Sequence, residues 1–305
     1  MTTIVERGDG RRFITGLVLA TIAFGILHLA ASDVKAGGVY WFNLDKERNI
    51  PTWFSGGLFA LFGFFALLIF HVEDGINRRA RASETPDTKA CFAMPELWLA
   101  VALVGFAMSL DEITVLHENL LWREVRTTTR AMGGFWVYMT QWQILYAPAI
   151  ISVFAFFTVF FTMRLPLSPG AAVRAFCGLS FWGGSIFVEG IRELFLGSGR
   201  FAYLLSVAVE ETAEMMGAVL LCAALLRYIA DVSGGDAVRL AEESRTRVRF
   251  LSPVVLKRLG ALAVALAVGA TIMVLVARTR SSDGEKLPAM QERIEKEMES
   301  EGMTE

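Results

Sequence analysis

The sequence predicts an all-α fold, a polytopic bundle of about seven transmembrane helices. Two observations carry this prediction. Hydrophobic residues make up 54% of the 305 residues and the mean hydropathy is +0.48, both high for a water-soluble domain. A bilayer core about 30 Å thick needs roughly 20 mainly apolar residues per helix. Stretches of that kind cover residues 13–31, 55–71, 96–118, 141–163, 172–195, 201–228 and 259–277.

The first apolar stretch follows Arg11 and Arg12, as in a signal peptide, but its run of about 18 residues exceeds the usual 7–15 of such a segment. We therefore expect a retained first helix. No connection between stretches is long enough for a further globular domain of ordinary size. Residues 1–280 are accordingly predicted to form one membrane domain. The tail, 281–305, holds eight Asp/Glu against three Lys/Arg, so we expect it to be solvated and flexible.

Basic residues predict the orientation of the bundle. With the N-terminus in the cytoplasm, the inner segments carry 16 Lys/Arg and the outer loops carry seven. The positive-inside rule then predicts an N-in, C-out topology. Because these residues lie in connecting segments rather than on one soluble face, no nucleic-acid partner is expected.

Ionisable residues interrupt three of the apolar stretches. In 96–118, Asp111, His117 and Glu118 would share an arc of about 120° if the whole stretch is helical. We therefore expect one polar face near the end of this helix.

The fifth and sixth stretches each carry a polar stripe as well. Glu189, Arg192 and Glu193 are spaced to share one helix face, and Glu210 and Glu214 are one turn apart. Counted along the N-in topology, all three acidic groups fall in the outer half of the bilayer.

These groups need compensation, since an ionisable residue near the bilayer centre costs roughly 2.5–3.5 kcal/mol. With Glu112 and Glu211 beside them there are eight carboxylates, which would approach or exceed about 20 kcal/mol. One arginine and one histidine cannot neutralise them, which leaves protonated carboxyls, a water-filled cavity or bound cations. Carboxylates with few imidazoles suit hard or borderline divalent ions.

The leading hypothesis is an intramembrane divalent-metal site that opens to the extracytoplasmic side. Its predicted ligands are Asp111, His117, Glu118, Glu189, Glu193, Glu210 and Glu214. The ligand types do not distinguish Fe, Mn, Mg, Ca and Zn. In a metal-dependent membrane enzyme, the metal-bound water would be the nucleophile or mark the position where an oxidant binds. Arg192 would contact an anionic substrate group or the charge of the transition state. A ferritin-like site is disfavoured because paired Glu-x-x-His motifs are missing from the sequence.

Two other classes of function stay open. A proton- or cation-coupled transporter would use mid-membrane carboxylates, yet the inner halves of the candidate helices are almost wholly apolar. In a structural membrane protein, Arg192 would pair with its neighbouring acids and the rest would line a wet crevice. The expected partners are the lipid bilayer and an unidentified small molecule or ion, and the oligomeric state is left open.

His28 lies at a depth similar to that of Asp111, near the end of the first predicted helix. We interpret it as a core histidine, with a role as a second imidazole ligand as the alternative. The following loop, 32–54, is interpreted as a re-entry turn rather than a structured lid over the acidic cluster. Arg48 and Phe54 occupy the positions where a calcium-binding EF-hand loop requires Gly and Glu.

Two short segments carry a resemblance to known sequences. FNLDKERNIPTWFS, residues 42–55, and SLDEITVLHE, residues 109–118, resemble segments of an uncharacterised bacterial family of polytopic membrane proteins with no known activity. The resemblance implies a location in the bacterial inner membrane and implies nothing about chemistry.

Overall fold

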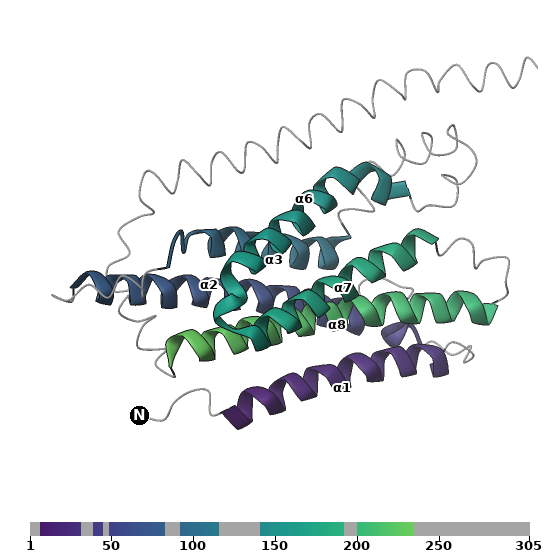
Figure 1. Cartoon of the computed structure of the whole chain (residues 1–305). Coiled ribbons are helices and arrows are strands. Elements are labelled where there is room, and N and C mark those ends of the chain that lie inside the picture. Colours follow the sequence, from purple (N-terminus) through teal and green to yellow (C-terminus); the bar gives the residue numbers. More distant parts are fainter. Residues whose placement is uncertain are drawn as a thin grey trace, which may run out of the picture.

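The computed structural model of the chain describes residues 7–31, 39–44, 49–82, 92–115, 141–191 and 200–234. Within these ranges all regular structure is helical, so the predicted all-α class is confirmed for the described part (Figure 1). The long helices are α1 (Arg7–Ala31), α2 (Ile50–Ala82), α3 (Leu97–Thr114), α6 (Gln141–Arg164), α7 (Pro169–Ile191) and α8 (Arg200–Ser233). Short 3-10 turns lie at Val39–Phe42 (η1) and Leu165–Leu167 (η4).

All six long helices in the described residues are long and apolar enough to cross a membrane. They coincide with six of the predicted stretches, and many large apolar side chains point outward, among them Ile151, Met163 and Phe201. This surface fits lipid contact and a multi-pass membrane protein. The seventh predicted stretch, 259–277, and the tail, 281–305, lie outside the described residues.

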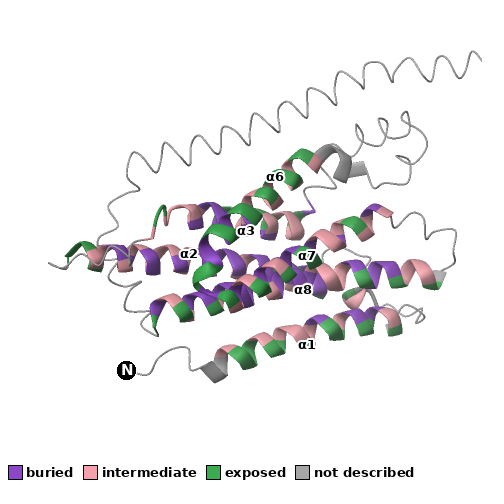
Figure 2. Cartoon of the chain, in the orientation of Figure 1, coloured by how far each residue is buried: buried purple, intermediate pink, exposed green. Residues whose placement is uncertain are grey.

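Helix α8 is at the centre of the described bundle. It packs along α7 and also contacts α1 and α2, while α3 packs on α2. Buried residues accordingly gather on α8, on α2 and on the surfaces that face them, whereas α1 is exposed along much of its length (Figure 2). The buried apolar residues form two clusters, one that joins α2, α3, α6, α7 and α8, and one that joins α2 and α8 beside α1.

Glycines allow two close contacts between helix backbones. A Cβ on Gly178 of α7 would lie 2.9 Å from the carbonyl oxygen of Gly217 on α8, and a Cβ on Gly105 of α3 would lie 2.9 Å from the nitrogen of Gly63 on α2. Neither contact leaves room for a side chain. Small residues at such points let helix backbones approach closely in a membrane.

Aromatic side chains fill one half of the bundle between α2, α3 and α6. The indole of Trp98 is fully buried, 4.7 Å from the ring of Phe160, and Phe62 packs edge-on against Phe157. Rings of this size bury a large apolar area each. This packed layer fixes α6 against α2 and α3 at the end of α6 that leads into η4.

Several helix boundaries differ from the prediction, among them the ends of α2 and α3. Helix α2 continues beyond residue 71 to Ala82, because residues 72–82 are mostly good helix formers and its last turn carries Arg79 and Arg81, which favour the negative end of the helix dipole. Helix α3 ends at Thr114 rather than at residue 118. Val115 takes a left-handed conformation, φ 55°, and its N–H donates to the carbonyl oxygen of Asp111.

Candidate functional site

One face of α7 is turned toward α8. Gly178 and Trp182 contact the backbone of α8 at Gly217, and Ser185 and Glu189 continue the same stripe at spacings of three and four residues. Ser185 is buried, and its hydroxyl donates to the carbonyl oxygen of Trp182 at 2.7 Å. The stripe therefore carries a carboxylate, Glu189, toward the end of α7.

The facing stripe of α8 reads Glu210, Glu214, Gly217 and Leu221 at spacings of four, three and four. Gly217 and Leu221 meet Gly178, and the helices run in opposite directions. The antiparallel register accordingly brings Glu210 to the level of Glu189. Glu210 is only 5% exposed, and Glu189 and Glu214 are partly buried. Three of the predicted ligands thus share one helix interface.

Helix α2 carries a buried hydroxyl one turn from its contacts with α7 and α8. Ser55 lies one helix turn before Leu58 and Phe59. The carbonyl oxygen of Leu58 accepts a hydrogen bond from Cys222 of α8, and the ring of Phe59 lies 6.2 Å from that of Trp182. The Ser55 side chain is buried, and within the described part of the chain its oxygen has no hydrogen-bond partner. A buried hydroxyl left without a partner costs about 1–3 kcal/mol. A polar species between α2, α7 and α8 would remove that cost.

Asp111 lies on a side of α3 that does not face α2. Helix α3 meets α2 through Gly105, Ser109 and Ile113, and Asp111 lies about half a turn around the helix from this line, half-buried. The arc expected to join it to His117 and Glu118 assumed a helix through residue 118. That assumption is wrong, because the described helix ends at Thr114.

The metal-site prediction is only partly covered by the described residues. Asp111, Glu189, Glu210 and Glu214 lie within them, while His117, Glu118, Glu193 and Arg192 lie outside. Among the described residues, no group of three or more His, Cys, Asp or Glu side chains is close enough to hold a metal ion. A complete ligand set would therefore include side chains from the remaining positions.

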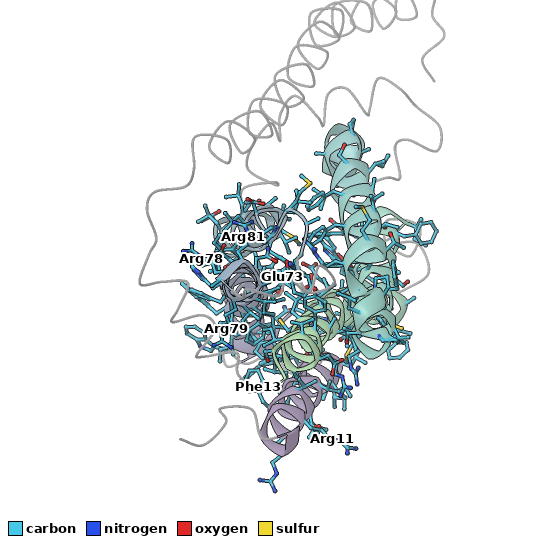
Figure 3. All side chains as sticks on the ribbon, turned by 60° about the vertical axis from the view of Figure 1, so that its left-hand side comes forward. Arg11, Phe13, Glu73, Arg78, Arg79 and Arg81 are labelled. Atoms are coloured by element: carbon cyan, nitrogen blue, oxygen red, sulfur yellow. The ribbon has the colours of Figure 1, made fainter. Side chains whose placement is uncertain are left out.

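Sequence analysis missed a second buried polar cluster, centred on Glu73 of α2. Its side chain is fully buried, and Oε1 accepts hydrogen bonds from the indole N–H of Trp98 at 2.9 Å and the hydroxyl of Tyr228 at 2.7 Å. Oε2 lies 3.4 Å from Nη2 of Arg164. These residues come from α2, α3, α6 and α8. Figure 3 shows Glu73 among the helices, with Arg78, Arg79 and Arg81 nearer the rim.

Arg164 connects this cluster to the segment before α3. Its Nη2 also donates to the carbonyl oxygens of Ala93 and Met94, and its guanidinium lies 5.7 Å from the ring centre of Phe160. Asn77, one turn beyond Glu73, exchanges two hydrogen bonds with the backbone of Phe92. The cluster therefore fastens four helices at one end of the bundle.

A signal for Glu73 is present in the sequence. Phe62, Ala66, Ile69, Glu73 and Asn77 follow one another at spacings of four, three, four and four, so the carboxylate continues the buried stripe of α2. A hydropathy window ends the helix before this point because the charges that follow lower its average.

His28 is a buried core residue, in keeping with the sequence interpretation. Its Nδ1 accepts a hydrogen bond from the backbone N–H of Leu44 at 3.1 Å, so the imidazole holds the end of the first connecting loop. Asn49 closes the same loop by accepting the N–H of Thr52 in the first turn of α2. The described part of the loop is thus tied to α1 and α2.

Comparison with known proteins gives one match. A protein-family model described as "Domain of unknown function (DUF8692)" matches residues 12–228, which include all six described long helices in whole or in large part. No curated protein and no solved structure matches the chain.

Proposed function

The chain belongs to the DUF8692 family, whose description assigns no activity, and we propose that it binds a divalent cation inside the membrane, between α7, α8 and α2. Glu189, Glu210 and Glu214 would supply carboxylate oxygens, but the described arrangement does not bring these three close enough to hold an ion by themselves. Predicted ligands outside the described residues, His117, Glu118 and Glu193, would complete the coordination, whereas Asp111 lies on the side of α3 that faces away from α2. The identity of the ion stays open among Fe, Mn, Mg, Ca and Zn.

The single observation that carries the proposal is the register of α7 and α8. The glycine contact between Gly178 and Gly217 brings Glu189 to the level of Glu210, on facing stripes. Like charges at such a level repel one another. A divalent cation between them would offset this repulsion. The buried hydroxyl of Ser55, one turn before Leu58 and Phe59 on α2, offers a further oxygen.

The proposal includes the location and orientation of the chain. We place it in the bacterial inner membrane with seven spans, N-in and C-out, on the distribution of Lys and Arg and the resemblance of its two short segments. In this orientation the α7–α8 carboxylates lie in the outer half of the bilayer. A metal-dependent membrane enzyme fits this position, with Arg192 available for an anionic group of the substrate.

A proton- or cation-coupled transporter is the second candidate, and one observation favours it. The inner half of α8 is less apolar than the sequence analysis held, because Tyr228 hydrogen-bonds to the buried carboxylate of Glu73. Helix α8 therefore contacts ionisable groups in both of its halves. A transporter requires polar groups along a path of this kind. Ion or proton flux in vesicles that stops in a Glu210→Gln variant would identify this function.

Thermal stability tests the cation site. Adding Mn²⁺ to purified, metal-depleted chain is expected to raise the unfolding temperature, because a ligand of the folded state at about 100 times its Kd stabilises by about 2.7 kcal/mol. Glu210→Gln, which keeps the shape of the side chain, should remove most of this rise.

Glu96→Gln is the matched control, since Glu96 precedes α3 and lies away from the α7–α8 stripes. Its Mn²⁺ response should equal that of the unaltered chain. The proposal fails if Mg²⁺, Ca²⁺, Mn²⁺, Fe²⁺ and Zn²⁺ all leave the unaltered chain unchanged. It also fails if Glu210→Gln responds as the control does.

A further inference from the structure

Two guanidinium groups meet at the end of the bundle where α7 begins and α8 ends. A Cβ on Gly170 would lie 3.2 Å from Nη1 of Arg174 and 3.8 Å from Nε of Arg227, so both groups lie within 4 Å of one point. Arg174 is exposed, and the side chain of Arg227 is 45% exposed. Helix α8 separates this point from Glu210 by 17 residues, or roughly 25 Å. The arginines therefore belong to the opposite end of the spans.

The pair carries an excess of positive charge. Asp231 accepts a hydrogen bond from Nε of Arg227 at 2.9 Å and another from the hydroxyl of Ser168. Nη1 of Arg174 donates to the carbonyl oxygen of Gly170. One carboxylate against two guanidiniums leaves a net charge of +1. This charge favours an anion, and arginine binds phosphate oxygens with two parallel N–H donors.

An exposed apolar surface continues from the pair toward the membrane interior. Cys177 and Phe181 follow Arg174 at spacings of three and four residues, so the three share one exposed face of α7. Val173 beside them is 65% exposed. A ligand that fits both parts has an anionic head and a hydrocarbon chain. Inorganic phosphate would use only the arginines.

We propose that Arg174 and Arg227 bind the phosphate of an anionic phospholipid in the leaflet at this end of the bundle, with an acyl chain along Cys177 and Phe181. The site is independent of the cation site, from which it is separated along α8. Other arginines lie at the same end of the bundle on α2, among them Arg78, Arg79 and Arg81 (Figure 3). Gly170 keeps the space between the two guanidiniums free of a side chain.

Lipid retention tests the proposal on the full chain. The protein is purified in detergent, mixed with phosphatidylglycerol or with phosphatidylcholine, and the bound lipid is measured by native mass spectrometry. Phosphatidylglycerol should be retained and phosphatidylcholine should not. The double variant Arg174→Gln/Arg227→Gln should bind phosphatidylglycerol about 30-fold more weakly, or by about 2 kcal/mol, since each arginine near an anionic surface contributes on the order of 1 kcal/mol.

The matched control is Arg79→Gln/Arg81→Gln, which removes the same charge from α2 at the same end of the bundle. It should retain phosphatidylglycerol as the unaltered chain does, and both variants should keep the helical circular dichroism of the unaltered chain. Equal losses in the two double variants would mean diffuse charge attraction and would overturn the site. Complete displacement by inorganic phosphate would identify a free-anion site instead of a lipid site. Equal retention of phosphatidylcholine and phosphatidylglycerol would exclude recognition of the headgroup and would overturn the proposal.

Discussion

Replacing Arg164 with methionine is expected to destabilise the fold by about 3–5 kcal/mol, because it leaves the carboxylate of Glu73 buried without its cation. Glu73 is fully buried, and its Oε2 lies 3.4 Å from Nη2 of Arg164. The substitution also frees the carbonyl oxygens of Ala93 and Met94, which accept from the same nitrogen. No neighbouring side chain in the described cluster supplies a replacement charge.

Unfolding in detergent, followed by circular dichroism, measures this effect. Arg79→Met is the control, since Arg79 is exposed at the end of α2 and its loss should change the unfolding free energy by no more than about 0.5 kcal/mol. The double variant Glu73→Gln/Arg164→Met removes both charges and should be more stable than Arg164→Met alone. A double variant that is the less stable of the two would contradict the account of the ion pair.

The second large effect is expected at the contact of α7 and α8. Gly178→Ala should destabilise the bundle by about 1–3 kcal/mol, because the added Cβ would lie 2.9 Å from the carbonyl oxygen of Gly217 and 3.1 Å from the nitrogen of Leu221. Both atoms belong to the backbone, so the helices must separate. Separation would also shift Glu189 relative to Glu210, and the Mn²⁺ response should weaken in parallel.

Gly184→Ala on the same helix is the matched control. A Cβ at Gly184 would meet nothing within 4 Å, so this substitution should stabilise α7 by about 0.5–1 kcal/mol through the higher helix propensity of alanine. Detergent unfolding of the two variants side by side measures the difference. If Gly178→Ala is as stable as Gly184→Ala, the close approach of the two helices is wrong.

Hydropathy was sufficient to predict the helices but not all of their ends. The span expected over 141–163 agrees with α6 at Gln141–Arg164, because lipid-facing and core-facing residues are both apolar there. The C-terminal ends of α2 and α3 were not predicted, for different reasons. Charged residues beyond His71 hide the continuation of α2, and the left-handed turn at Val115 has no marker, since valine is not a residue that favours positive φ.

The candidate site was predictable where it depends on one helix and not where it depends on three-dimensional packing. The spacing of Glu210 and Glu214, one turn apart and above Gly217, is visible in the sequence. The level of Glu189 against Glu210 depends on where α7 meets α8. Ser55 gave no signal at all, because a serine in an apolar helix becomes notable only when its burial and its lack of a partner are known.

The metal content of the purified chain tests the central proposal most directly. The unaltered protein, dialysed against Mn²⁺ and washed free of unbound ion, is expected to hold Mn²⁺ in a fixed ratio to the chain by elemental analysis. Glu189→Gln and Glu210→Gln should each lose this metal, whereas Glu96→Gln should retain it. Absence of bound metal from the unaltered chain, or full retention in both stripe variants, would contradict a cation site between α7 and α8.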